Sequence, residues 1–188
     1  MKNTKELTLA GMMIALMTVI AFVPQLGYIQ ITPVIGVTTM HIPVIIGAVL
    51  LGRKFGFILG TTFGILSFLV TLQRGATPFE LFFLNPLISV LPRVLFGMAV
   101  YEVYAFVKKF IKDDKILFPT TALITTLIHS VLVLGAIGII YGAQLNEWGI
   151  ENIMVWIWGI MVSNAIFEAI FAAILVTVVA VPLKKLVK

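Results

Sequence analysis

The sequence predicts an all-α membrane protein, a bundle of six transmembrane helices whose two termini are both cytoplasmic. Three observations support this fold class. Of the 188 residues, 61% are hydrophobic and only 11% are charged, whereas an average soluble domain is about 25% charged. The apolar residues form six long runs, and most of the basic residues lie in alternate connections between them. Residues 1–188 are expected to form a single integral-membrane domain.

The composition also excludes several classes of protein. The chain has no cysteine, so it is not a disulfide scaffold, and its two isolated histidines give no metal-ligand spacing. A net charge of +5 does not indicate nucleic acid, because the basic residues form short clusters instead of one exposed stripe. No G-x-x-x-x-G-K-[ST] phosphate loop is present, so the chain does not hydrolyse ATP itself. Neither a metal nor another cofactor is expected.

A membrane helix needs about 20 mostly apolar residues. The candidate spans are residues 7–23, 41–51, 55–72, 87–107, 117–141 and 153–183. The second could extend back to Val34, but Pro33 and Pro43 bracket a stretch that cannot be an uninterrupted helix. Irregular backbone at membrane depth must lie against other helices or line a cavity.

Lysine and arginine in short loops set the orientation of a membrane protein, because they remain on the cytoplasmic side. Eleven of the 13 basic residues lie before the first span, after the sixth, or in the connections between spans two and three and between spans four and five. The opposite connections, 24–33, 73–86 and 142–152, contain only Arg74. Both termini are therefore expected in the cytoplasm of a protein of the cell membrane.

Polar side chains inside the spans are the candidates for a binding site, because each is costly to insert and usually faces the interior of the bundle. Asn85, Ser89 and Arg93 are spaced by four and would share one helical face, as would Asn164 and Glu168. Most of these groups, with His129 and Ser67, fall near the middle or in the outer half of the membrane. They predict a polar pocket that opens outward.

Arg93 suits a small anion in such a pocket, since a guanidinium binds a carboxylate through two hydrogen bonds. An alternative is that Arg93 and Glu168 neutralise each other and the remaining polar groups only join helices. A further alternative is an intramembrane hydrolase that uses Ser67 and His129. It is disfavoured because no Gly-x-Ser-x-Gly turn surrounds Ser67.

Small residues recur on two spans and would permit close helix approach. Gly56, Gly60 and Gly64 form one series, for which packing within this chain is expected. Gly11 and Ala15 form another pair, on the first span.

Several of these segments together resemble one family, the substrate-binding S components of energy-coupling factor (ECF) vitamin transporters. They are the run Thr38-Thr39-Met40-His41-Ile42-Pro43 with the apolar residues up to Gly52, the Gly56-x3-Gly60-x3-Gly64-x2-Ser67 series, Leu91-Pro92-Arg93, and Asn164-x3-Glu168. Gly11-x3-Ala15 is similar to the Ala-x3-Ala face with which S components dock on their coupling subunit, with Gly in place of the first Ala.

The resemblance implies a vitamin-binding subunit without enzymatic activity. It implies that the partners are a transmembrane coupling subunit and two cytoplasmic ATPases, with Gly11 and Ala15 at the docking face. The Thr-x-x-His-Ile-Pro and Leu-Pro-Arg patterns look most like pantothenate carriers; alternatives are another vitamin such as riboflavin, or a membrane assembly factor without transport. The expected ligand contacts are Ser67, Thr39, Asn85, Ser89, Arg93, His129, Asn164 and Glu168.

Overall fold

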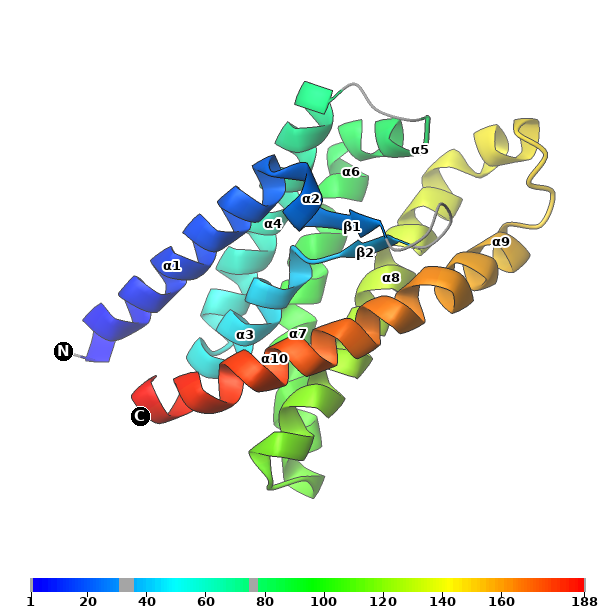
Figure 1. The fold of residues 1–188 in the computed structure, drawn as a ribbon. Helices are drawn as coiled ribbons and strands as arrows, with labels where there is room; N and C mark the ends of the chain where they lie inside the picture. The colour runs from blue at the N-terminus through cyan, green and yellow to red at the C-terminus, as the bar shows by residue number, and fades with distance from the viewer. Residues whose placement is uncertain (1, 31–35, 75–77, 188) are drawn as a thin grey trace.

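The computed structural model describes residues 2–30, 36–74 and 78–187, which form a helical bundle with one short β-hairpin (Figure 1). In chain order the elements are α1 (Lys2–Phe22), α2 (Pro24–Gly27), β1 (Tyr28–Gln30), β2 (Gly36–Thr38), α3 (His41–Leu51), α4 (Arg53–Arg74), α5 (Pro78–Leu81), η1 (Phe82–Leu84), α6 (Pro86–Ser89), α7 (Leu91–Phe110), α8 (Asp114–Glu147), α9 (Ile153–Ile160), η2 (Met161–Ala165) and α10 (Ile166–Val187).

Five helical segments are long and apolar enough to cross a membrane, which confirms the membrane fold class. They are Thr4–Phe22, Arg53–Gln73, Pro86–Phe110, Asp114–Glu147 and Ile153–Lys185. The remaining predicted span is the 11-residue helix α3, which is only about 16 Å long at 1.5 Å per residue. The hydrocarbon core of a bilayer is about 30 Å thick, so α3 covers about half of it.

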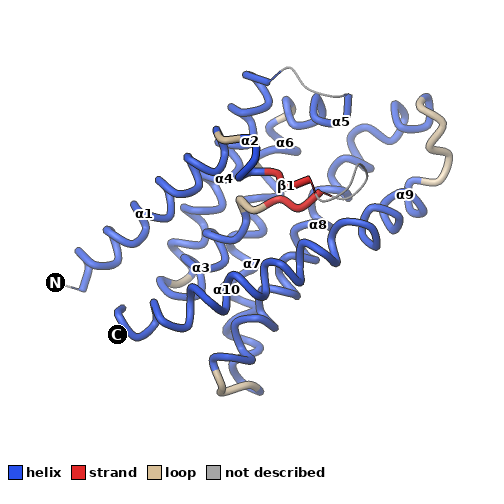
Figure 2. Tube along the Cα trace, viewed as in Figure 1, coloured by secondary structure: helices blue, strands red, loops and turns tan. Residues whose placement is uncertain are grey.

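The stretch between Pro33 and Pro43 was predicted not to form an uninterrupted helix, and its described part confirms this; the possible extension of the second span toward Val34, which itself lies outside the described residues, does not occur. Gly36–Thr38 is a strand that pairs with Tyr28–Gln30 in an antiparallel hairpin, and the helix begins only at His41. Figure 2 shows the hairpin in the middle of the helical bundle. Nine of the 11 residues of α3 are buried, so the irregular segment and the short helix lie against protein, as backbone at membrane depth requires.

The glycine series on α4 has the packing role that the sequence predicts. A Cβ built on Gly56 would lie 2.3 Å from the carbonyl oxygen of Gly97, and one on Gly64 would lie 2.7 Å from the Cα of Val90. Real Cβ contacts are never this short, so the absence of side chains allows α4 and α7 to touch backbone to backbone. This contact fixes the position of the start of α7 along α4.

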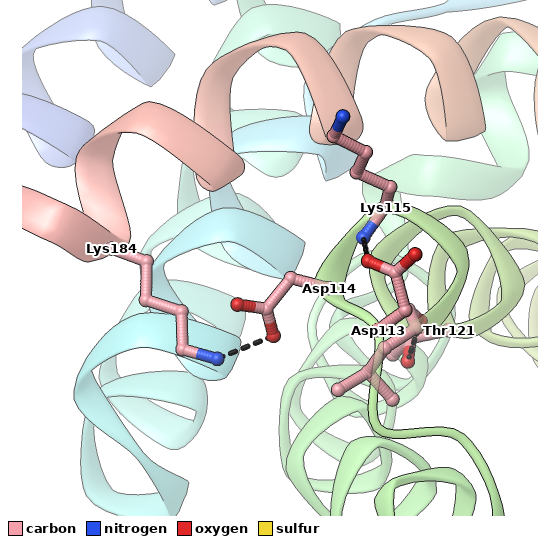
Figure 3. Close-up of polar contacts among 6 residues, drawn as sticks. Asp113, Asp114, Lys115, Thr121 and Lys184 are labelled. Atoms are coloured by element: carbon pink, nitrogen blue, oxygen red, sulfur yellow. Dashed lines mark hydrogen bonds and ion pairs between the residues drawn. The ribbon is translucent and has the colours of Figure 1, made fainter.

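Charged side chains join helices at one end of the bundle, where Figure 1 also shows the two termini. Lys184 near the end of α10 forms an ion pair of 2.5 Å with Asp114 at the start of α8 (Figure 3). Arg53 at the start of α4 pairs with Glu102 of α7 at 2.6 Å. Asp113 accepts a hydrogen bond from the backbone N–H of Lys115 and so caps α8. The basic clusters therefore gather at the end that holds both termini.

Candidate functional site

A cavity of about 190 Å³ lies where β2, α7, α8, η2 and α10 meet. Its polar wall consists of Thr38, Arg93, His129, Ser130, Asn164 and Glu168, and its apolar wall includes Phe83, Val133, Leu134, Ile160 and Ala165. One cationic and one anionic group among apolar side chains is typical of a small-molecule site, in which a few polar groups fix the orientation of a ligand.

Arg93 is held rigidly at this wall. Helix α6 ends at Ser89 and α7 begins at Leu91 with Pro92 as its second residue, which places Arg93 in its first turn. Its Nη1 donates a hydrogen bond of 2.5 Å to the carbonyl oxygen of Ile88. The guanidinium also lies over the rings of Phe83 and Phe63, at 4.8 and 5.5 Å from their centroids. These contacts hold the side chain in place. Its Nε has no hydrogen-bond partner, so this N–H can donate to a ligand.

Glu168 is engaged with the hairpin. Its Oε1 accepts two hydrogen bonds of 2.8 Å, one from the backbone N–H of Thr38 and one from the Thr38 hydroxyl. No ion pair joins the two described residues Arg93 and Glu168, although both face the same cavity. The alternative in which these two charges neutralise each other would therefore act across the cavity and not through a direct ion pair.

His129 stands in an aromatic enclosure on α8. Its ring is stacked on that of His41 at 5.8 Å between centroids, with 12° between the ring planes. Phe96 and Phe63 lie against the same ring at 4.8 and 5.5 Å. His129 lines the cavity, whereas His41 is completely buried behind it.

A second hollow of about 450 Å³ lies between α8 and the α9–η2 segment. It is larger than the first, but its lining includes Gly135, Ile139, Ile153 and Trp158 and contains no ionisable side chain. An anion would find no partner there, so the smaller cavity is the better candidate for a polar ligand.

Comparison with known proteins identifies the family. Residues 5–180 match the family model described as "ECF transporter, substrate-specific component". The chain belongs to this family. The pantothenic acid transporter PanT of Lactococcus lactis subsp. cremoris is 30% identical, over 98% of this chain and 97% of its own length. The pantothenate transporter PanT of Leuconostoc mesenteroides is 29% identical, over 94% of this chain and 91% of its own length.

This ECF substrate-specific component is thus a multi-pass transporter subunit and not an enzyme. The hydrolase alternative, with Ser67 and His129 as its reactive pair, is removed by the family membership. The resemblance seen in the sequence is confirmed.

Of the eight expected ligand contacts, the structure brings Arg93, His129, Asn164 and Glu168 to the cavity. The other four lie elsewhere and keep their ligand role only as a prediction. Ser67 lies part-buried on α4, away from the wall. Thr39 donates a hydrogen bond to the carbonyl oxygen of Leu26.

Asn85 and Ser89 are not among the residues that line the cavity. The side chain of Asn85 caps α6 by accepting a hydrogen bond of 3.0 Å from the N–H of Leu87. The hydroxyl of Ser89 donates a hydrogen bond of 3.2 Å to the carbonyl oxygen of Asn85. Asn85 is the extended N-cap residue that precedes α6, so a spacing of four, which assumes a helix, does not place its side chain.

Seven cavity residues were not predicted as site residues: the polar residues Thr38 and Ser130, the aromatic residue Phe83, and the aliphatic residues Val133, Leu134, Ile160 and Ala165. Thr38 opens the segment that carried the family resemblance, and Ser130 follows His129, so both had a signal in the sequence. Phe83 lies in the connection before α6, and nothing in its sequence context marked it.

Gly11 and Ala15 are both exposed on α1, while Met13 and Met17 of the same helix are buried. A Cβ on Gly11 would meet no atom within 4 Å. The pair thus faces away from the bundle.

Proposed function

We propose that this S component binds pantothenate from outside the cell and delivers it through a complex with a transmembrane coupling subunit and two cytoplasmic ATPases. The observation that supports the ligand is Arg93, a buried guanidinium fixed by Ile88 and two aromatic rings, with its Nε unpartnered at the cavity. The two relatives named as pantothenate transporters agree with this choice.

Pantothenate has a carboxylate at one end and an amide and two hydroxyls toward the other. Arg93 binds the carboxylate, because a planar fork of donors matches its two oxygens. Asn164 and His129 provide hydrogen bonds for the amide and hydroxyl groups. Glu168 accepts from a ligand hydroxyl or orients the wall through Thr38.

The ligand is tested by calorimetric titration of the purified protein in detergent with pantothenate and with its alcohol analogue, in which the carboxylate is replaced. Wild type should bind the acid and discriminate strongly against the alcohol. Arg93→Ala should bind the acid about ten- to a hundredfold more weakly, because a charge-assisted hydrogen bond contributes roughly 1.5–3 kcal/mol. It should bind acid and alcohol about equally, and Arg93→Lys should recover only part of the loss.

Equal discrimination by wild type and Arg93→Ala would show that Arg93 does not contact the carboxylate. Binding of riboflavin in place of pantothenate would assign the protein to another vitamin. A protein that no vitamin stabilises against heat would favour an assembly role, since a ligand that binds only the folded state must raise its stability.

The proposed orientation has six membrane crossings, α3 with its hairpin being one, and both termini in the cytoplasm. It is supported by the ion pairs Lys184–Asp114 and Arg53–Glu102, which place the basic clusters at the end of the bundle that holds the termini. The excess of lysine and arginine at that end favours its cytoplasmic location.

A further inference from the structure

Unpartnered polar atoms gather in one place behind the cavity. Among the described residues, six buried side-chain nitrogen or oxygen atoms have no hydrogen-bond partner. They are both ring nitrogens of His41, both of His129, Nε of Arg93 and Oγ1 of Thr126. The great majority of buried polar atoms in native proteins are partnered, so a concentration of exceptions indicates a group that is meant to bind there.

The two histidines form the centre of this cluster. His41 is completely buried at the start of α3, and its ring is stacked on that of His129. The ring of Phe96 packs against both imidazoles; its centroid lies 6.4 Å from that of His41 and 4.8 Å from that of His129. The two imidazole rings are thus oriented by packing, and their nitrogens have no hydrogen-bond partners.

Thr126 adds a buried hydroxyl on the same helix as His129. It precedes His129 by three residues on α8, so the two share a helical face. Thr121 and Thr125 of this helix donate their hydroxyls to backbone carbonyls four residues earlier, each at 2.8 Å. Thr126 makes no such bond and is fully buried. Its hydroxyl is available to another partner.

A neutral imidazole carries one donor and one acceptor nitrogen. Two such rings and a threonine hydroxyl therefore match a group that both donates and accepts, and a hydroxyl is the smallest one. The ring centroids of the two stacked imidazoles are 5.8 Å apart, with 12° between their planes. Imidazole hydrogen bonds lie in the plane of the ring, so a small group that binds both rings would lie at their edges, where it can reach a nitrogen of each.

We propose that His41 and His129, with Thr126, form an inner subsite that binds a hydroxyl oxygen, supplied by the ligand or by an ordered water. In the first case the proposal rests on the proposed function, and the subsite holds the hydroxyl-bearing end of pantothenate while Arg93 holds the carboxylate. His41, which was not among the expected contacts, then becomes a residue that determines specificity.

Calorimetry with two ligands distinguishes the sources. The probes are pantothenate and N-(3,3-dimethylbutanoyl)-β-alanine, which has the same skeleton without either hydroxyl. Wild type should prefer pantothenate by about tenfold or more, because leaving buried partners unpaired costs roughly 1–3 kcal/mol. His41→Phe and His129→Phe retain an aromatic ring and lose the nitrogens. If the ligand supplies the hydroxyl, these variants should bind both probes within about twofold of each other.

If a water supplies it, the two variants should weaken both probes by the same factor. The matched control is Phe96→Leu, which disturbs the packing of both rings and removes no polar atom. It should preserve the preference of wild type. Unchanged affinities in the histidine variants, or an equal loss of preference in Phe96→Leu, would overturn the proposal.

A second measurement does not depend on the identity of the vitamin. The chain has only two histidines, so ¹⁵N-histidine labelling of the untagged protein reports on this pair alone. Ring-nitrogen shifts of hydrogen-bonded imidazoles are expected in the ligand-free protein if water occupies the subsite, or only after addition of pantothenate if the ligand does. If wild type fails to bind pantothenate, the proposed function fails, and hydrogen-bonded shifts without ligand would still support the subsite. Shifts of unbonded nitrogens under both conditions would refute it.

Discussion

Gly60 of α4 lies directly against the backbone of Arg93 on α7. A Cβ placed on Gly60 would be 2.4 Å from the carbonyl oxygen of Arg93 and 3.1 Å from the Cα of Gly97. The residue that faces the cavity with a guanidinium is therefore held from behind by a residue with no side chain.

Replacing Gly60 by alanine should destabilise the protein by about 1–3 kcal/mol, the usual cost of overpacking a close contact. Because α7 must move, Arg93 should also shift and ligand binding should weaken. Thermal unfolding in detergent and ligand titration measure the two effects. The control is Gly135→Ala on α8, where a Cβ meets no atom within 4 Å. Its stability should equal or exceed that of wild type, and equal behaviour of the two variants would argue against the tight contact.

The bond between Glu168 and Thr38 should hold the end of the hairpin on α10. Glu168→Ala removes the acceptor of two hydrogen bonds, so the amide of Thr38 should exchange with solvent about ten- to a hundredfold faster, as expected for loss of roughly 1.5–3 kcal/mol. Glu168→Gln keeps an acceptor oxygen and should stay much closer to wild type. Hydrogen exchange resolved to residues 36–38 measures the exchange rate of the Thr38 amide. Indistinguishable rates in the two variants would show that the Glu168–Thr38 hydrogen bonds do not hold the hairpin.

Much of the fold could be predicted from the sequence because it depends on local apolar runs. Five of the predicted apolar runs form membrane-length helices. The glycine series packs closely against a neighbouring helix, as predicted. The bounds of α3, His41–Leu51, coincide with the predicted core of the second span. The hairpin before it was not predicted, because Gly36–Thr38 forms a strand through its pairing with Tyr28–Gln30, which no local pattern contains.

The site was predicted only in part for a related reason. Arg93, His129, Asn164 and Glu168 line the cavity and could be singled out because a polar side chain in an apolar span is conspicuous; their role in ligand binding stays a prediction. Asn85 does not line the cavity, because a spacing of four implies one face only within a helix and Asn85 is the extended N-cap residue before α6. Thr38 meets Glu168 across 130 residues of sequence, a contact that no local pattern contains.

Membrane orientation can be tested on α8, which is kinked at Tyr141; its straight part, residues 114–140, spans about 40 Å at 1.5 Å per residue. This exceeds the bilayer core of about 30 Å, so its two ends should lie on opposite sides. The natural chain has no cysteine, which makes single cysteines at Lys112 and Asn146 clean reporters. A membrane-impermeant thiol reagent added outside intact cells should label Asn146→Cys and leave Lys112→Cys unlabelled.

A cysteine at Lys185, near the end of α10, serves as a second reporter for the same side as Lys112. If Lys112→Cys and Asn146→Cys are labelled from one side, α8 does not cross the membrane and the topology is wrong. If Lys185→Cys is labelled from outside and Lys112→Cys is not, the C-terminus is not cytoplasmic.

The last prediction concerns the coupling subunit. Gly11 and Ala15 are exposed on α1, with open space beside Gly11, so a larger side chain there should not disturb the fold. Gly11→Leu and Ala15→Leu should abolish copurification with the coupling subunit and uptake of vitamin by cells, because a close helix contact requires small residues. Ligand binding by the isolated protein should remain within about twofold of wild type, a difference below 0.5 kcal/mol.

Gly159→Leu is the matched control, since Gly159 is also exposed with no atom near its Cβ position but lies on α9. That variant should assemble and transport normally. If Gly159→Leu abolishes assembly as well, bulk anywhere on the lipid-facing surface is enough, and α1 is not the docking helix. If the α1 variants lose ligand binding but still assemble, these small residues serve the packing of this chain instead.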